Sequence, residues 1–303
     1  MNIAFIIQDR IPTTDNIAAA LRDLGHRVDE LVYCADGSFD FRVQRDGAGI
    51  ELQIQGQRIR PEAYDSALTW CWGTARAAAV LLACFEDAGV PVLAPTRLTR
   101  IWDSKVSSAR LFEAHGVAIP PTRLFDRGAQ FDAGRLEGLG GPPYVFKFDY
   151  GTRGQGVRIC ESLDDVKHLA KTAAARREGF VVQRCIRDDA GSIAAYRVMV
   201  IADRVVPKTL RRSPAGVLGD FDSKQTGYIE MLDTPDDLAA LALQATRVTE
   251  LEVCGVDLLR DEHGSPMVLE CNDGAGTHRF DERGVDVSRM CAEAFIDLVS
   301  RIR

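Results

Sequence analysis

The sequence predicts an α/β protein that begins with an open, mainly parallel sheet and continues into mixed α+β parts. Short apolar segments alternate with helical segments over the first 95 residues, which is the pattern of parallel strands joined by crossover helices. From residue 120 to residue 186, strands and helices flank a glycine-rich loop, which indicates a small α+β unit. A hairpin of two apolar strands follows near residue 260, within a last part that holds further strands and two helices.

The composition is that of an ordinary globular protein, with 46% hydrophobic and 27% charged residues. A chain of 303 residues is too long for one small core, so two or three domains are expected. The net charge of −7 gives no indication of a nucleic-acid-binding surface. A local cluster of lysine and arginine can still bind an anion, because it outweighs a diffuse negative field.

The eight cysteines are scattered and form no C-x-x-C pair, which argues against a structural zinc site and against a secreted disulfide scaffold. We expect most of them to be small buried hydrophobic residues. No apolar stretch reaches transmembrane length, and the first residues resemble a strand rather than a signal peptide because they carry no basic segment. We therefore expect a cytoplasmic protein without nucleic-acid or membrane partners.

The first part of the chain is expected to hold four strands and two helices. Each helix is followed by a glycine, Gly25 or Gly89, which is the usual residue after a helix C-terminus. The polar, glycine-rich segment 36–60 indicates an inserted hairpin. No G-x-G-x-x-G motif follows the first strand, so dinucleotide binding is not supported. The strands are expected at 3–7, 27–32, 67–72 and 90–93, and the helices at 16–24 and 75–88.

A helix at 102–114, ended by Gly116, leads to Pro120-Pro121-Thr122, which marks a domain junction. The unit from there to Ile186 is expected to run strand, helix, strand, loop, strand, helix, strand. The last part is expected to hold strands at 195–201, 204–210, 253–259 and 266–271, and helices at 235–251 and 287–302.

Three oxygen-bearing side chains lie at the ends of the two hairpin strands. The segment 260–264 is polar and ends in glycine, which predicts the turn that brings Asp257 close to Glu270 and Asn272. Glu270 and Asn272 are two residues apart on one strand and therefore point to the same face. Such a set of hard oxygen donors suits Mg²⁺. The alternative is an ordinary hairpin with polar residues on its solvent face.

A glycine-rich loop follows a strand that carries Lys147. Gly151, Gly154 and Gly156 let backbone N–H groups approach a polyphosphate, and Lys147 with Arg153 would add positive charge. The loop leads into a strand rather than a helix, so it is not a Walker A motif. The alternative is a glycine-rich turn with a solvated lysine.

Two further segments are candidates for ligand contacts. The apolar strand 180–186 runs into a linker whose backbone could bind an adenine edge, or it is simply the edge strand of the small unit. Arg197 lies within an apolar strand, where its charge requires a partner such as Glu270, a bound phosphate or an internal salt bridge. Lys208 and the pair Arg211-Arg212 follow on the next strand. The alternative for the pair is two solvated side chains without a role in binding.

Taken in order, these motifs resemble the ATP-grasp superfamily, and most closely its RimK-like branch of carboxylate–amine ligases. The resemblance covers Thr99 to the C-terminus. It rests on Asp103-Ser-Lys105, Gly116-Val-Ala-Ile-Pro120-Pro-Thr122, Val145-Phe-Lys147 with the loop 151–157, Val182-Gln183 to Ile186, Arg197, Arg211-Arg212, Gly255-Val-Asp257, Glu270-Cys-Asn272 and Gly284-Val-Asp286-Val287.

The resemblance implies a three-domain ATP-grasp architecture, with an N-terminal α/β domain at 1–98, a small central domain at 99–186 and a C-terminal domain at 187–303. ATP would be clamped between the second and third domains. Lys105 and Lys147 would hold its α- and β-phosphates. The glycine-rich loop would close over the phosphates, and the hinge would line the adenine pocket. The loop residues are Gly151, Thr152, Arg153, Gly154, Gln155 and Gly156, and the pocket residues are Gln183, Arg184, Cys185 and Ile186.

The resemblance also implies the metal and the reaction. Asp257, Glu270 and Asn272 would hold two Mg²⁺ ions, for which Mn²⁺ is a substitute. A substrate carboxylate would attack the γ-phosphate to give an acyl phosphate, and an amine would then displace the phosphate to form an amide. Arg197, with Arg211 or Arg212, would stabilise the negative charge of these intermediates.

Two positions depart from the RimK-like pattern. Ala195 stands where an aspartate usually precedes the arginine by two residues, so that Asp188 or Asp189 would contact the ribose instead. Lys224 stands where an asparagine is usual, which suggests an acidic or carboxylate-bearing substrate.

The expected substrates are an amino acid, a peptide or a peptide precursor that supplies a carboxylate and an amine. Three alternatives stay open at this stage: a small-molecule kinase, a macrocyclase that forms side-chain esters or amides, and a nucleotide-binding module without turnover. The last is disfavoured because the chain retains three metal ligands. Both a monomer and a homo-oligomer are compatible with the sequence.

Overall fold

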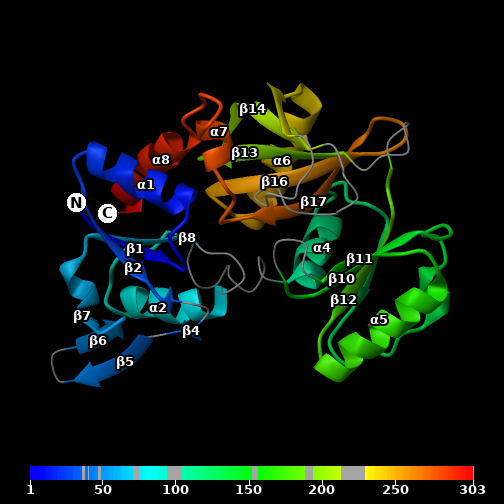
Figure 1. Cartoon of the computed structure of the whole chain (residues 1–303), viewed down its shortest axis with the longest axis horizontal. Helices are drawn as coiled ribbons and strands as arrows, with labels where there is room; N and C mark the ends of the chain where they lie inside the picture. Colours follow the sequence, from blue (N-terminus) through cyan, green and yellow to red (C-terminus); the bar gives the residue numbers. More distant parts are fainter. Residues whose placement is uncertain are drawn as a thin grey trace. The chain divides into compact units, whose positions relative to one another are not determined.

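The computed structural model describes residues 1–35, 38–39, 41–46, 49–70, 75–93, 104–151, 156–187, 194–212 and 229–302. The chain forms two compact units (Figure 1). The first joins Met1–Thr99 to Asp273–Arg303, and the second is Arg100–Asn272. The predicted division into domains at 1–98, 99–186 and 187–303 stays a prediction.

The first unit is built on a three-stranded parallel sheet. Its strands are β1 (Asn2–Ile7), β2 (Arg27–Val32) and β8 (Ser66–Trp70), in the order β2-β1-β8. The central strand β1 is almost fully buried, because it is apolar at every position from Ile3 to Ile7. The fourth strand predicted at 90–93 is reduced to a single bridge between Ala67 and Val92. Pro91 lacks an N–H group and cannot extend a regular ladder.

Among the described residues, this unit contains the helices α1 (Pro12–Asp23), α2 (Ala75–Asp87), α7 (His278–Asp281) and α8 (Val287–Ile302). Helix α1 begins four residues before the predicted start, because Pro12 has a helix-compatible φ and Thr14 accepts a hydrogen bond from the Ile11 N–H. Gly25 and Gly89 follow α1 and α2 with φ of +84° and +75°, as expected for residues that end helices.

The insertion in the first unit contains more strands than the predicted hairpin. A short ribbon of β3 (Cys34–Ala35) and β4 (Ser38–Phe39) precedes an antiparallel sheet of β5 (Phe41–Asp46), β6 (Gly49–Ile54) and β7 (Gln57–Ile59). The second turn was not predicted. Gln55 and Gly56 both have positive φ there, 49° and 75°, which is the geometry of a tight two-residue hairpin turn.

The second unit contains a small antiparallel sheet with the order β11-β10-β12-β9. Its strands are β9 (Thr122–Phe125), β10 (Tyr144–Phe148), β11 (Val157–Cys160) and β12 (Phe180–Arg184), and its helices are α4 (Lys105–Ala114) and α5 (Leu163–Arg176). Helix α5 covers one face of the sheet (Figure 1). The helix predicted between β9 and β10 is wrong, because only the 3-10 turn η3 (Ala133–Leu136) forms in this glycine-rich stretch.

A five-stranded antiparallel sheet completes the second unit, in the order β15-β14-β13-β16-β17. The strands are β13 (Ala195–Ile201), β14 (Arg204–Arg212), β15 (Ile229–Asp233), β16 (Val253–Arg260) and β17 (Pro266–Asn272). Helix α6 (Asp236–Thr249) packs on the sheet (Figure 1). The sequence pattern did not predict β15, whose residues are all at least partly exposed.

Most of the described cysteines are buried free thiols, as expected; Cys185 and Cys271 are partly exposed. Cys71 lies outside the described residues.

In the described part of the chain, no helix has the length and apolar character needed to cross a membrane.

Candidate active site

The hairpin of β16 and β17 brings the three predicted oxygen donors together. Asp257 lies directly opposite Glu270, and Asn272 donates a hydrogen bond of 3.3 Å from Nδ2 to Oδ2 of Asp257. The predicted turn is present, since Asp261 and Ser265 close it and Gly264 has a φ of +80°. Among the described residues, no cluster of three or more His, Cys, Asp or Glu side chains exists, so any metal here would be held by two carboxylates and one amide.

Arg197 forms a buried ion pair with Asp257. The two residues lie opposite each other on β13 and β16, and two parallel hydrogen bonds of 2.8 Å join the guanidinium to the carboxylate. The side chains are only 6% and 9% exposed. The predicted partner Glu270 is thus replaced by Asp257, because the register of β13 against β16 sets Arg197 beside that residue. The internal salt bridge, one of the three partners considered for Arg197, is present.

The strand register also separates the two arginines of β14. Arg212 lies opposite Ala195, two residues from Arg197 along β13, so it shares the sheet face of Arg197 and Asp257. Arg211 lies opposite Tyr196 and therefore points to the other face, where its guanidinium is 3.8 Å from the Glu230 carboxylate. Arg212 is buried, whereas Arg211 is partly exposed.

Lys105, the first residue of α4, and Lys147 on β10 both interact with the charged residues of the five-stranded sheet. Burial lowers the pKa of Lys147 to about 8, while the charges of Glu270 and Asp257 partly oppose this shift. Burial alone would raise the pKa of Glu270, but the positive charges of Lys105, Lys147 and Arg197 lower it. Three cations and two carboxylates, carried by α4, β10 and the strands β13, β16 and β17, therefore act on one another.

The first residue of the glycine-rich loop, Gly151, contacts Lys105. The Lys105 ammonium donates a hydrogen bond of 2.7 Å to the carbonyl oxygen of Gly151. At the other end of the loop, Gly156 has a φ of +88° and its carbonyl oxygen accepts a hydrogen bond from the Phe148 N–H. The predicted loop residues Thr152, Arg153, Gly154 and Gln155 lie outside the described residues, as do Asp188, Asp189 and Lys224.

The predicted adenine hinge lies at the end of β12. Gln183 is buried and its amide donates to the Thr122 hydroxyl at 2.9 Å. The N–H groups of Arg184 and Cys185 donate to the carbonyl oxygens of Pro121 and Pro143. These bonds hold the hinge against Thr122, Pro121 and Pro143, and Ile186 beside it is buried. Its contact with adenine stays a prediction.

Asp149, two residues after Lys147, was not predicted as a site residue. It is 7% exposed and accepts hydrogen bonds from residues on both sides of Lys105. An acidic residue at the end of an apolar strand was the only signal for it. Its partners are more than forty residues earlier in the chain, so local patterns do not reveal them.

A family model described as the RimK-like ATP-grasp domain matches residues 102–295. The chain belongs to the RimK-like ATP-grasp family. Among its relatives, a probable alpha-L-glutamate ligase of Trichodesmium erythraeum is 30% identical over 212 residues, which are 69% of this chain and 69% of that protein. A probable alpha-L-glutamate ligase of Nitrosococcus oceani is 30% identical over 213 residues, 69% of this chain and 68% of that protein.

Solved structures support the fold of this RimK-like chain along its whole length. The RimK domain ATP-grasp protein of Sphaerobacter thermophilus has a TM-score of 0.69 at 19% identity, covering 97% of this chain and 99% of that one. D-alanine–D-alanine ligase of Bacillus anthracis, complexed with ATP, has a TM-score of 0.72 at 16% identity, with coverage of 100% and 98%. The ATP-grasp ligase PsnB, complexed with minimal precursor, Mg and ADP, has a TM-score of 0.67 at 20% identity, with coverage of 98% and 97%.

The predicted family and the α/β ATP-grasp fold class are confirmed. The expectation of an ATP-dependent ligase is confirmed at the level of the family. The individual roles of the candidate site residues stay predictions.

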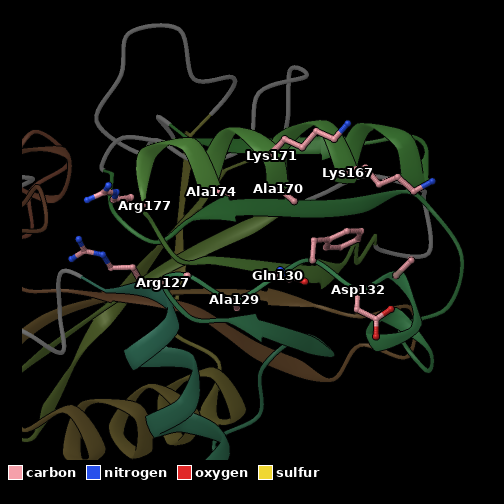
Figure 2. A pocket seen from close by; sticks show the side chains of 12 residues that line it. Arg127, Ala129, Gln130, Asp132, Lys167, Ala170, Lys171, Ala174 and Arg177 are labelled. Atoms are coloured by element: carbon pink, nitrogen blue, oxygen red, sulfur yellow. The ribbon is translucent and has the colours of Figure 1, made fainter.

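A separate basic groove lies beside helix α5 of this RimK-like chain (Figure 2). It runs between α5 and the segment 127–133, with a cavity volume of about 1020 Å³. Lys167 and Lys171 line it from the helix, and Arg127 and Arg177 lie at one end. Phe146 and Phe148 pack in the core that α5 covers, so strand alternation places Lys147 on the opposite face of the sheet. The groove is therefore distinct from the candidate active site.

Proposed function

We propose that this chain is an ATP- and Mg²⁺-dependent carboxylate–amine ligase. It would form an amide bond through an acyl-phosphate intermediate, acting on an amino acid, a peptide or a peptide precursor. The observation that carries this proposal is that the Lys105 and Lys147 side chains lie close to those of Asp257, Glu270 and Asn272. Cations and oxygen donors so arranged suit the phosphates of ATP and the metal ions that accompany them.

The donor set fits Mg²⁺. Asn272 donates a hydrogen bond to Asp257, and a hydrogen bond from Asn272 contributes to the lowered pKa of Glu270, so that the Asn272 side chain contacts both carboxylates. The lowered pKa keeps Glu270 ionised near neutral pH, as metal ligation requires. Bound Mg²⁺ would neutralise charge on the phosphate oxygens, and these three residues would hold two ions, with Mn²⁺ as a substitute.

The lysines would bind and orient the phosphates. At neutral pH a pKa of about 8 leaves Lys147 largely protonated, and a neighbouring phosphate would favour the charged form further. Lys105 is at the first position of α4, so its backbone N–H lies at the positive end of that helix. Both cations would therefore act where the negative charge of ATP is largest.

The arginines of the large sheet would stabilise the charge that develops on the substrate. Arg197 and Arg212 share the face that carries Asp257 and Glu270, whereas Arg211 does not. We therefore propose Arg197 and Arg212 as the pair that stabilises the acyl phosphate and the tetrahedral intermediate. Arg197 would serve a second purpose, because it holds the Asp257 carboxylate in place before any metal binds.

The names of the relatives support an amino acid as one substrate and make glutamate the first to test. The decisive experiment measures ATP consumption with Mg²⁺ against a panel of amino acids and short peptides, resolving ADP, AMP and phosphate. We expect ADP and phosphate only when a carboxylate and an amine are both present, with a product lighter by one water than their sum. A phosphorylated product without amide would establish a kinase instead, and formation of AMP would contradict the acyl-phosphate route.

A further inference from the structure

The carboxylate of Asp149 connects the two elements that carry the candidate phosphate-binding lysines. Asp149 follows β10, two residues after Lys147. Its Oδ1 atom accepts a hydrogen bond of 2.7 Å from the Ser104 hydroxyl and one of 2.9 Å from the Val106 N–H. These two donors are the residues on either side of Lys105. The Lys105 N–H itself donates to the backbone carbonyl oxygen of Asp149 at 3.1 Å.

We propose that Asp149 is a positioning residue that fixes Lys105 relative to Lys147, so that both ammonium groups meet the phosphates of one nucleotide at a set spacing. This inference rests on the proposed function, since it requires that both lysines bind phosphate. Asp149 itself need not touch the nucleotide, because its hydrogen bonds fix the position of the backbone that carries the Lys105 side chain.

The hydrogen bonds at the start of α4 explain why this connection is rigid. The first three N–H groups of a helix have no partner within the helix. Here Lys105 and Val106 donate theirs to Asp149, and Ser107 donates its own to the Ser104 hydroxyl at 3.0 Å. Helix α4 therefore cannot slide along β10 without leaving buried donors unsatisfied, which is costly. A negative carboxylate at this end also interacts favourably with the helix dipole.

The segment that follows Asp149 is held as well. The Asp149 N–H donates to the Gly179 carbonyl oxygen at 3.0 Å, and the Tyr150 N–H donates to the Glu178 carboxylate at 2.9 Å. Lys105 then reaches Gly151 at the entrance of the glycine-rich loop. The backbone from Lys147 to Gly151 is thus fixed to both α4 and the start of β12, with Asp149 at the junction.

The same domain contains a matched helix cap that lacks this connection. Ser162 and Asp165 cap the N-terminus of α5 through a reciprocal pair of side-chain to backbone hydrogen bonds. Helix α5 covers the sheet face opposite Lys147. Removing the Asp165 carboxylate therefore destabilises a helix of the same domain without changing the spacing of the two lysines.

The test compares binding of two ligands by isothermal titration calorimetry of the full chain. One is a non-hydrolysable ATP analogue with Mg²⁺, and the other is adenosine, which lacks phosphates. For Asp149→Ala we expect the Kd of the analogue to rise about tenfold or more, while the Kd of adenosine changes little. Asp149→Asn retains the oxygen that accepts both hydrogen bonds, so its effect is expected to be intermediate. Asp165→Ala is expected to bind both ligands like the wild type.

Several outcomes would overturn the proposal. It fails if a folded Asp149→Ala chain binds the analogue with unchanged affinity, or loses adenosine binding to the same extent. It also fails if Asp165→Ala weakens analogue binding equally, since the effect would then be general destabilisation. If Asp149→Ala does not fold, Asp149→Asn and Ser104→Ala carry the comparison. A wild-type chain that binds no nucleotide would refute the proposed function itself, and the positioning role with it.

Discussion

Replacing Arg197 with methionine would leave the buried Asp257 carboxylate without its main partner. The ion pair is bidentate at 2.8 Å and both side chains are more than nine-tenths buried. Loss of one member of such a pair costs about 3–5 kcal/mol, because the remaining charge stays buried without compensation. For a domain of this size the melting temperature falls by roughly 6–20 °C. The double variant Arg197→Met/Asp257→Leu removes both charges and is expected to recover part of this loss.

Thermal and urea unfolding, followed by circular dichroism, measure these differences. The matched control is Arg110→Met, which removes a partner of Asp126 from an ion pair of 2.9 Å whose side chains are 60% and 63% exposed. An exposed pair contributes about 1 kcal/mol or less, so this control is expected to unfold almost like the wild type. The reasoning is refuted if Arg197→Met and Arg110→Met lose the same stability.

Three other predictions concern the site. Glu270→Gln is expected to abolish ATP turnover while the chain stays folded, because it removes the charge of a proposed metal ligand; near-normal turnover would contradict the metal assignment. Arg212→Ala is expected to lower turnover about 100-fold or more, as loss of a donor to a developing oxyanion does, whereas Arg211→Ala, on the opposite sheet face, is expected to have little effect. The pKa of Lys147 falls from 10.5 to about 8 on folding, so between these pH values the unfolded chain binds more protons and stability rises with pH. The wild type is therefore expected to be less stable than Lys147→Met, and urea unfolding across this range is expected to show this difference becoming smaller as the pH rises. A difference that stays constant with pH would argue against the shift.

Features determined by neighbouring residues could be predicted from the sequence. The β16–β17 hairpin follows from two apolar strands around a polar turn that ends in Gly264, and this turn sets Asp257 opposite Glu270. The limits of α8 and β13 coincide with the predicted ones, because apolar periodicity defines both ends. The single helix predicted between β9 and β10 failed because helix propensity was overestimated in a segment rich in glycine and proline.

Features determined by pairing between distant strands could not be predicted. The partner of Arg197 depends on the register of β13 against β16, whose residues are 60 positions apart. A shift of one residue would have turned Arg197 to the opposite face. The same register distinguishes Arg212 from Arg211, although the two are adjacent in sequence. The role of Asp149 could not be predicted either, because it depends on the contact between the start of α4 and the end of β10.

The charged residues Arg197, Asp257 and Glu270 form a row across three neighbouring strands, β13, β16 and β17. The next strand beyond β13 is β14, which ends at Arg212. A change in the sequence after Arg212 therefore leaves the spacing of the row unaltered, because hydrogen bonds between β13, β16 and β17 set that spacing. A lineage, or an engineer, could thus vary that part of the chain while retaining the row of charged residues.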